Sequence, residues 1–306
     1  MKIKVWHYNF WNTFGNTEIL ERSFTRILNE EGYEFVLDKD NPDIVFICQF
    51  GSIIYNGPAI KIGYVTEDMN RFTGIYRKIQ EKNYFDFIIG SLPPIKSSKF
   101  CKHPMYIDTN IHRKPSMSMM DNINNNVKNK DVSKLKFCCL IASHDMYDNR
   151  MPVVKLLSDL GKVECPGKFN NNVKSFDDEG LTKQEYLENF LFTICPENHK
   201  GHEGYTSEKI PQAIESGCIP IYFGRTDDEQ DIKIFNQDRI IRYDPESTES
   251  MKSCYNKIKE LMENPDKLKE FYQQPPYLEN ADQVIENMYD DLKKKFKRLL
   301  KKKNFT

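Results

Sequence analysis

Residues 195–224, CPENHKGHEGYTSEKIPQAIESGCIPIYFG, bring polar and charged side chains to a turn between a predicted strand and a predicted helix. Open α/β sheets bind ligands at such turns, outside the carboxyl ends of their strands. A helix beginning near Ser207 directs unpaired backbone N–H groups at the ligand, and Lys209 adds a positive charge, so the turn suits a phosphate. The alternative is that these charged residues are only the solvated first turn of a helix. This explains the charges at the helix start but not the whole cluster of polar residues before it. The candidate ligand-binding side chains are Glu197, Asn198, Tyr205, Glu208 and Lys209.

Two further candidates follow other predicted strands. Arg150, in SHDMYDNRMPVV, precedes a predicted helix, and its planar guanidinium suits a bidentate phosphate contact. An ordinary salt bridge in a loop is the alternative for this residue. Glu67, in YVTEDMNRF, is a candidate general base for an attacking hydroxyl group. Asp68 and Glu197 are the other candidates for the general base, and the remaining alternative is that Glu67 only makes surface contacts.

The first third of the chain alternates strands and helices. Its apolar runs lack strict alternation, which is typical of strands covered on both faces in a parallel, doubly wound sheet. Residues 113–133 interrupt this pattern, and their richness in Asn, Met and Lys predicts a linker or mobile loop. The predicted strands are 3–8, 34–37, 44–48, 60–65 and 85–89, with a helix over 17–31 that ends at Gly32.

A second α/β domain begins near Leu135. The predicted strands are 136–142, 162–165, 192–194, 218–223 and 239–243, and the predicted helices are 152–160, 182–189, 248–263 and 281–300. The expected organisation is an N-terminal Rossmann-like domain over 1–115, a linker or mobile loop over 116–134, a ligand-binding domain over 135–280, for which the resemblance described next implies a nucleotide sugar as the ligand, and a C-terminal helix and basic tail over 281–306.

Residues 192–221 form a sequence signature that resembles that of the α-1,3-fucosyltransferases, glycosyltransferase family 10. The resemblance rests on the aromatic strand at 192–194, Glu197-Asn198, the run from Tyr205 to Ile210, Gly217, and the strand Ile219-Pro220-Ile221. The segment with Ser143 and Arg150, the pair Asn170-Asn171 and the run from Phe85 to Gly90 extend it. This chain has Pro196 where the family usually has Phe, His199 where it has Ser, and His144 where it has Asn.

The resemblance implies a GT-B fold, in which two Rossmann-like domains face a cleft and the C-terminal helix crosses back toward the first domain. It implies an inverting transfer of fucose from GDP-fucose to a glycan hydroxyl, without a metal or another cofactor. Arg150 and Lys209 would then bind the diphosphate, Glu67 would be the base, and Asn198, Tyr205 and Glu208 would bind the ribose and the sugar ring. Another nucleotide-sugar donor, or a non-catalytic binding protein with the same fold, are the alternatives.

Composition limits the other classes of partner. The 306 residues carry a net charge of −1, which argues against nucleic acid as the main partner. The eight cysteines show no CxxC pair, which indicates reduced, mostly buried thiols. The pair Asp227-Asp228 lies in a charged loop, and His199 and His202 lack further ligands, so we expect no metal site.

The sequences at the two ends of the chain indicate where in the cell the protein is expected. The N-terminus reads as a strand without a secretory signal, and no apolar run reaches the length of a membrane span, so we expect a soluble, cytoplasmic protein or a trimmed catalytic domain. The basic residues over 293–303 suggest a peripheral membrane contact, and a third class of function is a scaffold recruited to membranes by this tail. A solvated helix end is the alternative.

Overall fold

The chain folds into two compact units, which a computed structural model describes over residues 2–10, 30, 32–69, 71–81, 83–92, 97–107, 117–201, 204–225 and 231–303. Unit 1 comprises Met1–Pro115, Gly201–Ser207 and Gln283–Thr306, and unit 2 comprises Ser116–Lys200 and Glu208–Asp282. The chain therefore enters unit 1 three times, once through a short segment inside the signature.

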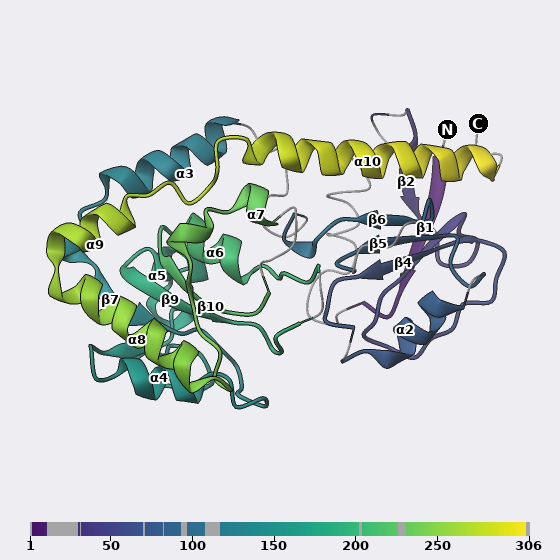
Figure 1. Cartoon of the computed structure of the whole chain (residues 1–306). Helices are drawn as coiled ribbons and strands as arrows, with labels where there is room; N and C mark the ends of the chain where they lie inside the picture. Colours follow the sequence, from purple (N-terminus) through teal and green to yellow (C-terminus); the bar gives the residue numbers. More distant parts are fainter. Residues whose placement is uncertain are drawn as a thin grey trace. The chain divides into compact units, whose positions relative to one another are not determined.

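Unit 1 is built on a parallel sheet of six strands in the order β2-β1-β3-β4-β5-β6 (Figure 1). The strands at its centre are short and almost wholly apolar, as expected for strands covered on both faces. The elements are β1 (Lys2–Tyr8), β2 (Glu34–Leu37), β3 (Ile44–Ile47), β4 (Ile60–Val65), α2 (Thr73–Gln80), β5 (Phe87–Gly90), β6 (Phe100–Lys102) and the long helix α10 (Ala281–Lys302).

Two helices cover opposite faces of this sheet. Helix α10 packs Leu292, Phe296 and Leu300 on a core that includes Val5 and Tyr64. Figure 1 shows this helix running along the sheet of unit 1. Helix α2 places its buried residue in the core of the other face. The C-terminal helix thus returns to the first domain, as the resemblance implied.

Unit 2 is built on a parallel sheet of five strands in the order β11-β10-β9-β7-β8. Its strands are β7 (Lys136–Cys139), β8 (Val163–Glu164), β9 (Phe190–Pro196), β10 (Ile219–Phe223) and β11 (Ile241–Arg242). Its helices are α3 (Met117–Asn129), α4 (Met151–Leu157), α5 (Lys183–Leu187), α6 (Lys209–Glu215), α7 (Asp231–Ile234), α8 (Thr248–Glu263) and α9 (Pro265–Tyr272). Short 3₁₀ turns cover Val132–Lys134, Asp177–Glu179 and Gln237–Arg239.

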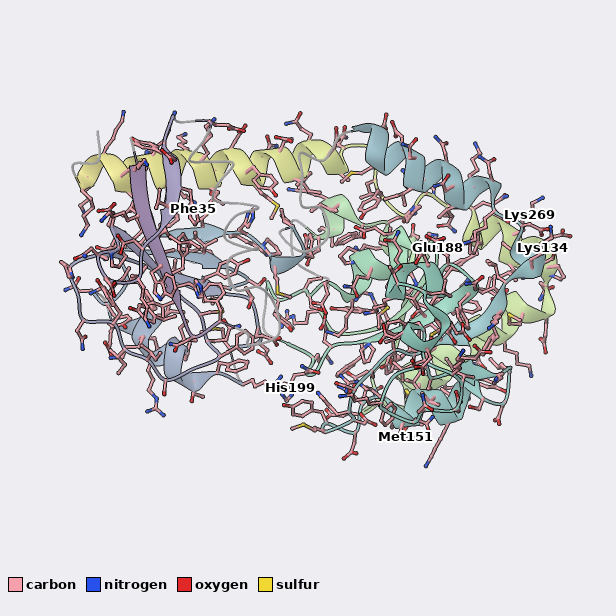
Figure 2. The ribbon with its side chains drawn as sticks, turned by 180° about the vertical axis from the view of Figure 1, so that it is seen from behind. Phe35, Lys134, Met151, Glu188, His199 and Lys269 are labelled. Carbon is pink, nitrogen blue, oxygen red and sulfur yellow. The ribbon has the colours of Figure 1, made fainter. Side chains whose placement is uncertain are left out.

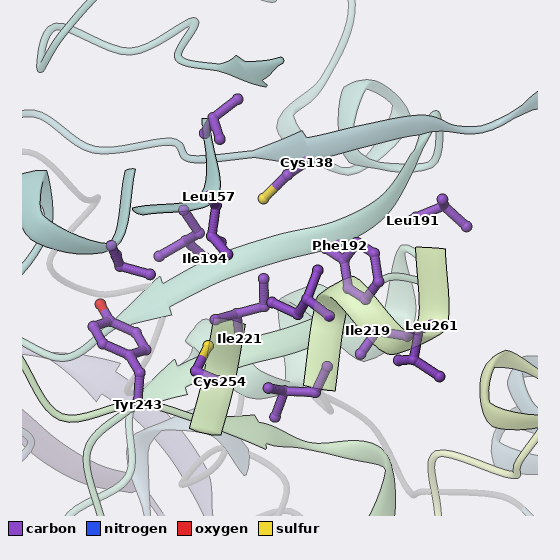
Figure 3. Packing of buried hydrophobic residues seen from close by; sticks show 14 of the residues in the cluster. Cys138, Leu157, Leu191, Phe192, Ile194, Ile219, Ile221, Tyr243, Cys254 and Leu261 are labelled. Atoms are coloured by element: carbon purple, nitrogen blue, oxygen red, sulfur yellow. The ribbon is translucent and has the colours of Figure 1, made fainter. Parts of the chain in front are cut away.

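The core of unit 2 joins its central strands to helices α4, α8 and α9. Figure 3 shows Phe192 and Ile194 of β9 gathered with Ile221 of β10, and Cys254 and Leu261 of α8 beside them. Two Rossmann-like sheets in one chain confirm the predicted GT-B fold.

The predicted linker over 116–134 was wrong, because residues 117–129 form helix α3. Met120 and Val127 are buried at helical spacing, and the Asn124 amide bonds with the backbone of Tyr277. Asparagine is a poor helix former, so tertiary packing decides the structure of this segment. The predicted helix over 17–31 lies outside the described residues except for Glu30.

All eight cysteines are buried, which confirms the prediction that most of the thiols lie in the interior. Within the described ranges, no helix has the length and apolar character needed to cross a membrane.

Candidate active site

The strand order of unit 2 places a topological switch point at the carboxyl ends of β7 and β9, which is where open parallel sheets form a ligand-binding crevice. The chain runs from β7 outward to β8, then returns to the other side of β7 for β9 and β10. Ligands bind at such a switch point in open parallel sheets. Arg150 follows β7, and Glu197 and Asn198 follow β9, so this topology brings the predicted residues to the same crevice. Figure 2 labels two landmarks here, Met151 at the start of α4 and His199 after Asn198.

The Arg150 side chain is buried at this crevice, with 4% of its surface exposed. Its guanidinium donates to the Asn198 Oδ1 atom at 2.9 Å and to the His144 carbonyl oxygen, and lies 3.1 Å from the His144 Nδ1 atom. Its Nε atom has no hydrogen-bond partner in the described part of the chain. Burial lowers the pKa of Arg150, and the charge of Asp145 opposes that shift. Arginine stays protonated under such conditions, so the crevice holds a fixed cation.

Asp145 fixes the backbone that carries Arg150. One carboxylate oxygen accepts from the backbone N–H groups of Asn149 and Arg150 at 3.1 and 3.0 Å, and the other accepts from Met151 at 2.8 Å. These groups form the first turn of α4, where backbone donors otherwise lack partners. The Asp145 carboxylate therefore positions Arg150 through the backbone. None of the hydrogen bonds given for Asp145 in the described part of the chain involves the Arg150 guanidinium.

Asn149 ties this turn to the signature. Its amide nitrogen donates to the carbonyl oxygens of Glu197 and Asn198 at 2.7 and 3.0 Å. The Tyr243 hydroxyl donates to the Asn149 carbonyl oxygen at 3.0 Å. Asn149 was not among the predicted site residues, although its position next to Arg150 in the sequence was a usable signal.

Lys209 and Glu197 form a partly buried ion pair. The Lys209 Nζ atom lies 2.9 Å from Glu197 Oε2, and the Glu197 side chain is 0% exposed. The Tyr222 hydroxyl donates to the other carboxylate oxygen at 3.3 Å. Glu197 is therefore the buried counter-ion of Lys209, and an enclosed carboxylate does not suit the rival role of general base. The Glu208 Oε1 atom lies 3.8 Å from Lys209 Nζ. Glu208 is the N-cap residue of α6, so this helix begins at Lys209, two residues later than predicted.

Replacing Glu197 with glutamine should lower the free energy of unfolding by about 2 kcal/mol, because it leaves Lys209 without its counter-ion. Fully buried pairs lose more, but Lys209 keeps 24% of its side-chain surface exposed. Urea denaturation of Glu197→Gln measures this effect, with the exposed Glu249→Gln as the matched control. Equal stability of the two variants would contradict the role given to Glu197.

Unit 1 holds the other predicted residues, Glu67 and Tyr205. The Tyr205 hydroxyl donates to the Glu67 Oε2 atom at 3.3 Å, and the tyrosine is buried with 2% exposure. Gly204 makes this possible: its φ is +85°, and a Cβ atom there would lie 2.5 Å from the Leu92 carbonyl oxygen. Only glycine fits this position without backbone movement. The signature therefore supplies a partner to the predicted base.

The predicted residues thus form two hydrogen-bonded groups, one in each unit. Arg150, Asn198, Glu208 and Lys209 belong to unit 2, and Glu67 and Tyr205 belong to unit 1. The predicted acidic pair Asp227-Asp228 and His202 lie outside the described residues. Lys183 was not among the predicted residues. Its Nζ atom donates to Oε1 of Gln212 in helix α6 at 2.6 Å, and burial lowers its pKa.

Comparisons with known proteins give the family. The model of glycosyltransferase family 10 (fucosyltransferase), C-terminal part, matches residues 131–296. The chain is 25% identical over 257 residues to the α-(1,3)-fucosyltransferase FucT of Helicobacter pylori, covering 72% of this chain and 50% of that protein. It therefore spans about half the length of this curated relative.

Solved structures agree in fold. An α1,3-fucosyltransferase crystallised with GDP is similar with a TM-score of 0.65 and 18% identity, over 96% of this chain and 90% of that one. The Anabaena protein HepE, in complex with UDP and glucose, is similar with a TM-score of 0.53 and 9% identity, over 99% and 100% of the two chains. The family match covers more than half of the 306 residues, and the chain belongs to glycosyltransferase family 10.

Proposed function

We propose that the protein transfers fucose from GDP-fucose to a hydroxyl group of a glycan, with inversion at the anomeric carbon. The observation that carries this proposal is the approach of two cations to one turn. Arg150 bonds to Asn198 and Lys209 pairs with Glu197, the two consecutive residues that follow β9. A departing diphosphate needs such charge neutralisation in a transferase that lacks a metal. The related α1,3-fucosyltransferase has also been crystallised with GDP-fucose.

The proposed reaction is a single displacement. The acceptor oxygen attacks the anomeric carbon of fucose while the bond from that carbon to the β-phosphate oxygen breaks, and GDP leaves. Glu67 takes the proton of the attacking hydroxyl, and the Tyr205 hydroxyl orients its carboxylate from the side. Arg150 and Lys209 stabilise the charge that develops on the leaving phosphate. Glu67 thus receives the proton, the β-phosphate oxygen keeps the electron pair of the broken bond, and the reaction needs no other reactant.

Three polar residues remain for recognition of the donor. We assign Asn198 and Glu208 to the hydroxyl groups of the ribose and the sugar, since amide and carboxylate oxygens accept from hydroxyls. Tyr205 was expected to share this task, and its bond to Glu67 adds a role in placing the base.

Isothermal titration against GDP-fucose, GDP-mannose and UDP-sugars tests the proposal. GDP-fucose should bind at least tenfold more tightly than the others, a difference of about 1.4 kcal/mol. Stronger binding of another nucleotide sugar would replace fucose as the donor. Binding of GDP-fucose without transfer to any member of a glycan array would favour a non-catalytic relative.

We further propose that the reaction needs no metal, since Arg150 and Lys209 supply the positive charge that a divalent cation supplies elsewhere. Dialysis of the protein against EDTA should leave the transfer rate within about twofold of the untreated enzyme, because no metal would contribute to leaving-group departure. A loss of turnover that added Mg²⁺ or Mn²⁺ restores would contradict this proposal.

A peripheral membrane contact through α10 is a separate proposal. The apolar residues of its last turns, such as Phe296 and Leu300, are buried in the core of unit 1. Its exposed positions there are cationic: Lys294, Arg298, Lys301 and Lys302. Contact with an anionic membrane would therefore rest on charge, without insertion of apolar side chains.

Charge reversal tests this contact better than truncation, because truncation after Asp290 removes buried core residues. The triple variant Lys294→Glu, Arg298→Glu, Lys301→Glu should bind phosphatidylserine vesicles about 100-fold more weakly, since each basic residue near such a surface contributes about 1 kcal/mol. Cosedimentation at low salt measures the binding, with Lys252→Glu on the exposed side of α8 as the control. Equal binding by the triple variant would exclude the contact.

A further inference from the structure

A cavity opens at the carboxyl edge of the sheet in unit 2. It has a volume of about 530 Å³ and is lined by the ends of β10 and β11, the residues that follow them, Lys200 after β9 and the start of α8. Its walls include Tyr222 and Tyr243. Its polar groups are two serines, one carboxylate and three cations: Ser247, Ser250, Asp244, Lys200, Arg225 and Arg242. A volume of this size accommodates a drug-sized or nucleoside-sized ligand.

Direct hydrogen bonds join this cavity to the donor-binding residues. The Tyr222 hydroxyl donates to Glu197, the counter-ion of Lys209. The Tyr243 hydroxyl donates to the carbonyl oxygen of Asn149, the residue before Arg150. The side chains that line the cavity therefore also support the two cations proposed to bind the diphosphate, so the cavity adjoins the proposed diphosphate site.

Two of the lining residues, Lys200 and Asp244, form an ion pair. The Lys200 Nζ atom lies 2.7 Å from Asp244 Oδ2, and the other Asp244 oxygen accepts from the backbone N–H of Glu246 at 3.1 Å. The hydrogen bond from Lys200 holds the pKa of Asp244 below its usual range. The Asp244 side chain is 20% exposed and that of Lys200 is 68% exposed, so both can meet a ligand. Together they present acceptor oxygens beside a charged donor.

This arrangement complements one base among the common five. The Watson–Crick edge of guanine carries two adjacent donors, the N2 amino group and N1–H, followed by the acceptor O6. A carboxylate accepts from two neighbouring donors, and an ammonium donates to the next oxygen. Adenine places its N1 acceptor against the carboxylate, and uracil flanks its single N3–H donor with two carbonyl oxygens, so both meet repulsion.

We propose that the Lys200–Asp244 ion pair recognises the guanine base of the donor nucleotide in this cavity. This inference rests on the proposed function, because it names the part of the protein that selects GDP over other nucleoside diphosphates. Asp244 accepts from N1–H and the 2-amino group, and Lys200 donates to O6. The cavity thus sets specificity for the nucleotide, whereas Arg150 and Lys209 act on its phosphates.

Titration of the wild-type protein with GDP, IDP and ADP tests the inference without any substitution. IDP differs from GDP only by the missing 2-amino group, so it removes one hydrogen bond to a charged acceptor. GDP should bind about 10- to 100-fold more tightly than IDP, and ADP should bind more weakly than both. Equal affinity for GDP and IDP overturns the assignment of Asp244.

Asp244→Asn supplies the second arm. It should weaken GDP binding by at least about tenfold and reduce the preference for GDP over IDP to about twofold or less, because an amide accepts with only one oxygen. Measurable IDP binding shows that the variant is folded, and Glu249→Gln, an exposed carboxylate of α8, should keep the wild-type preference. A variant that retains the full preference overturns this inference alone. A wild-type protein that binds no GDP overturns the proposed function and the inference with it.

Discussion

Replacing Glu67 with glutamine will lower kcat for transfer by about 10²- to 10⁴-fold, while GDP affinity stays within about twofold of wild type. Glutamine keeps the size of the side chain and an oxygen that accepts from the Tyr205 hydroxyl, so the local contact at 3.3 Å can persist. It lacks a basic oxygen, and the acceptor proton then has no positioned recipient. The loss should therefore appear in kcat and not in the binding of the nucleotide.

The pH profile separates a base from a structural carboxylate. The kcat of the wild-type enzyme should fall at acidic pH as Glu67 becomes protonated, and the residual activity of Glu67→Gln should not show this fall. Glu34→Gln is the matched control, since Glu34 is an exposed glutamate of unit 1 with 62% of its side chain accessible. If Glu67→Gln retained a third or more of the wild-type kcat, the base would have to be another residue, and Asp68 would be examined next.

The fold was predictable where local pattern and tertiary burial agree. Helix α8 spans residues 248–263, as the sequence analysis predicted, because its buried residues Cys254, Ile258 and Leu261 recur at helical spacing and Ser247 caps its start. Strand β9 is buried throughout and lies between two parallel neighbours. Helix α3 was missed because its Asn-rich pattern has weak helix propensity, and packing on unit 2 supplies what propensity lacks.

The site was predictable residue by residue but not contact by contact. Arg150 and Lys209 were recognisable by type and place, since cations after strands and at helix starts suit phosphate. The bond of Tyr205 to Glu67 joins residues 138 positions apart, and no spacing rule reaches that far. Glu197 followed a strand like a functional carboxylate, yet the Tyr222 hydroxyl and Lys209 enclose it. Glu197 is buried partly by Tyr222 of the neighbouring strand β10, and the sequence alone does not show which strand lies beside β9.

Substituting alanine for Arg150 or Lys209 will lower kcat/KM by about 10²- to 10³-fold each, because each removes one cation from the departing diphosphate. Arg150→Lys should lose nearly as much as Arg150→Ala. The guanidinium donates to the His144 carbonyl and to Asn198 at once, and a lysine side chain cannot reproduce that fork. The double alanine variant should fall by less than the product of the two losses, since both act on one leaving group.

Nucleotide titration identifies the phosphates as the point of action. Each alanine variant should weaken GDP binding by about tenfold or more and leave guanosine binding nearly unchanged, since only GDP carries the charge that these residues meet. Asp244→Asn should instead weaken both ligands, because the base is common to them. Lys252→Ala, an exposed lysine of α8, is the control for removing a positive charge from unit 2. Equal losses on GDP and guanosine for Arg150→Ala and Lys209→Ala would place these two cations away from the diphosphate, and the proposed mechanism of leaving-group departure would fail.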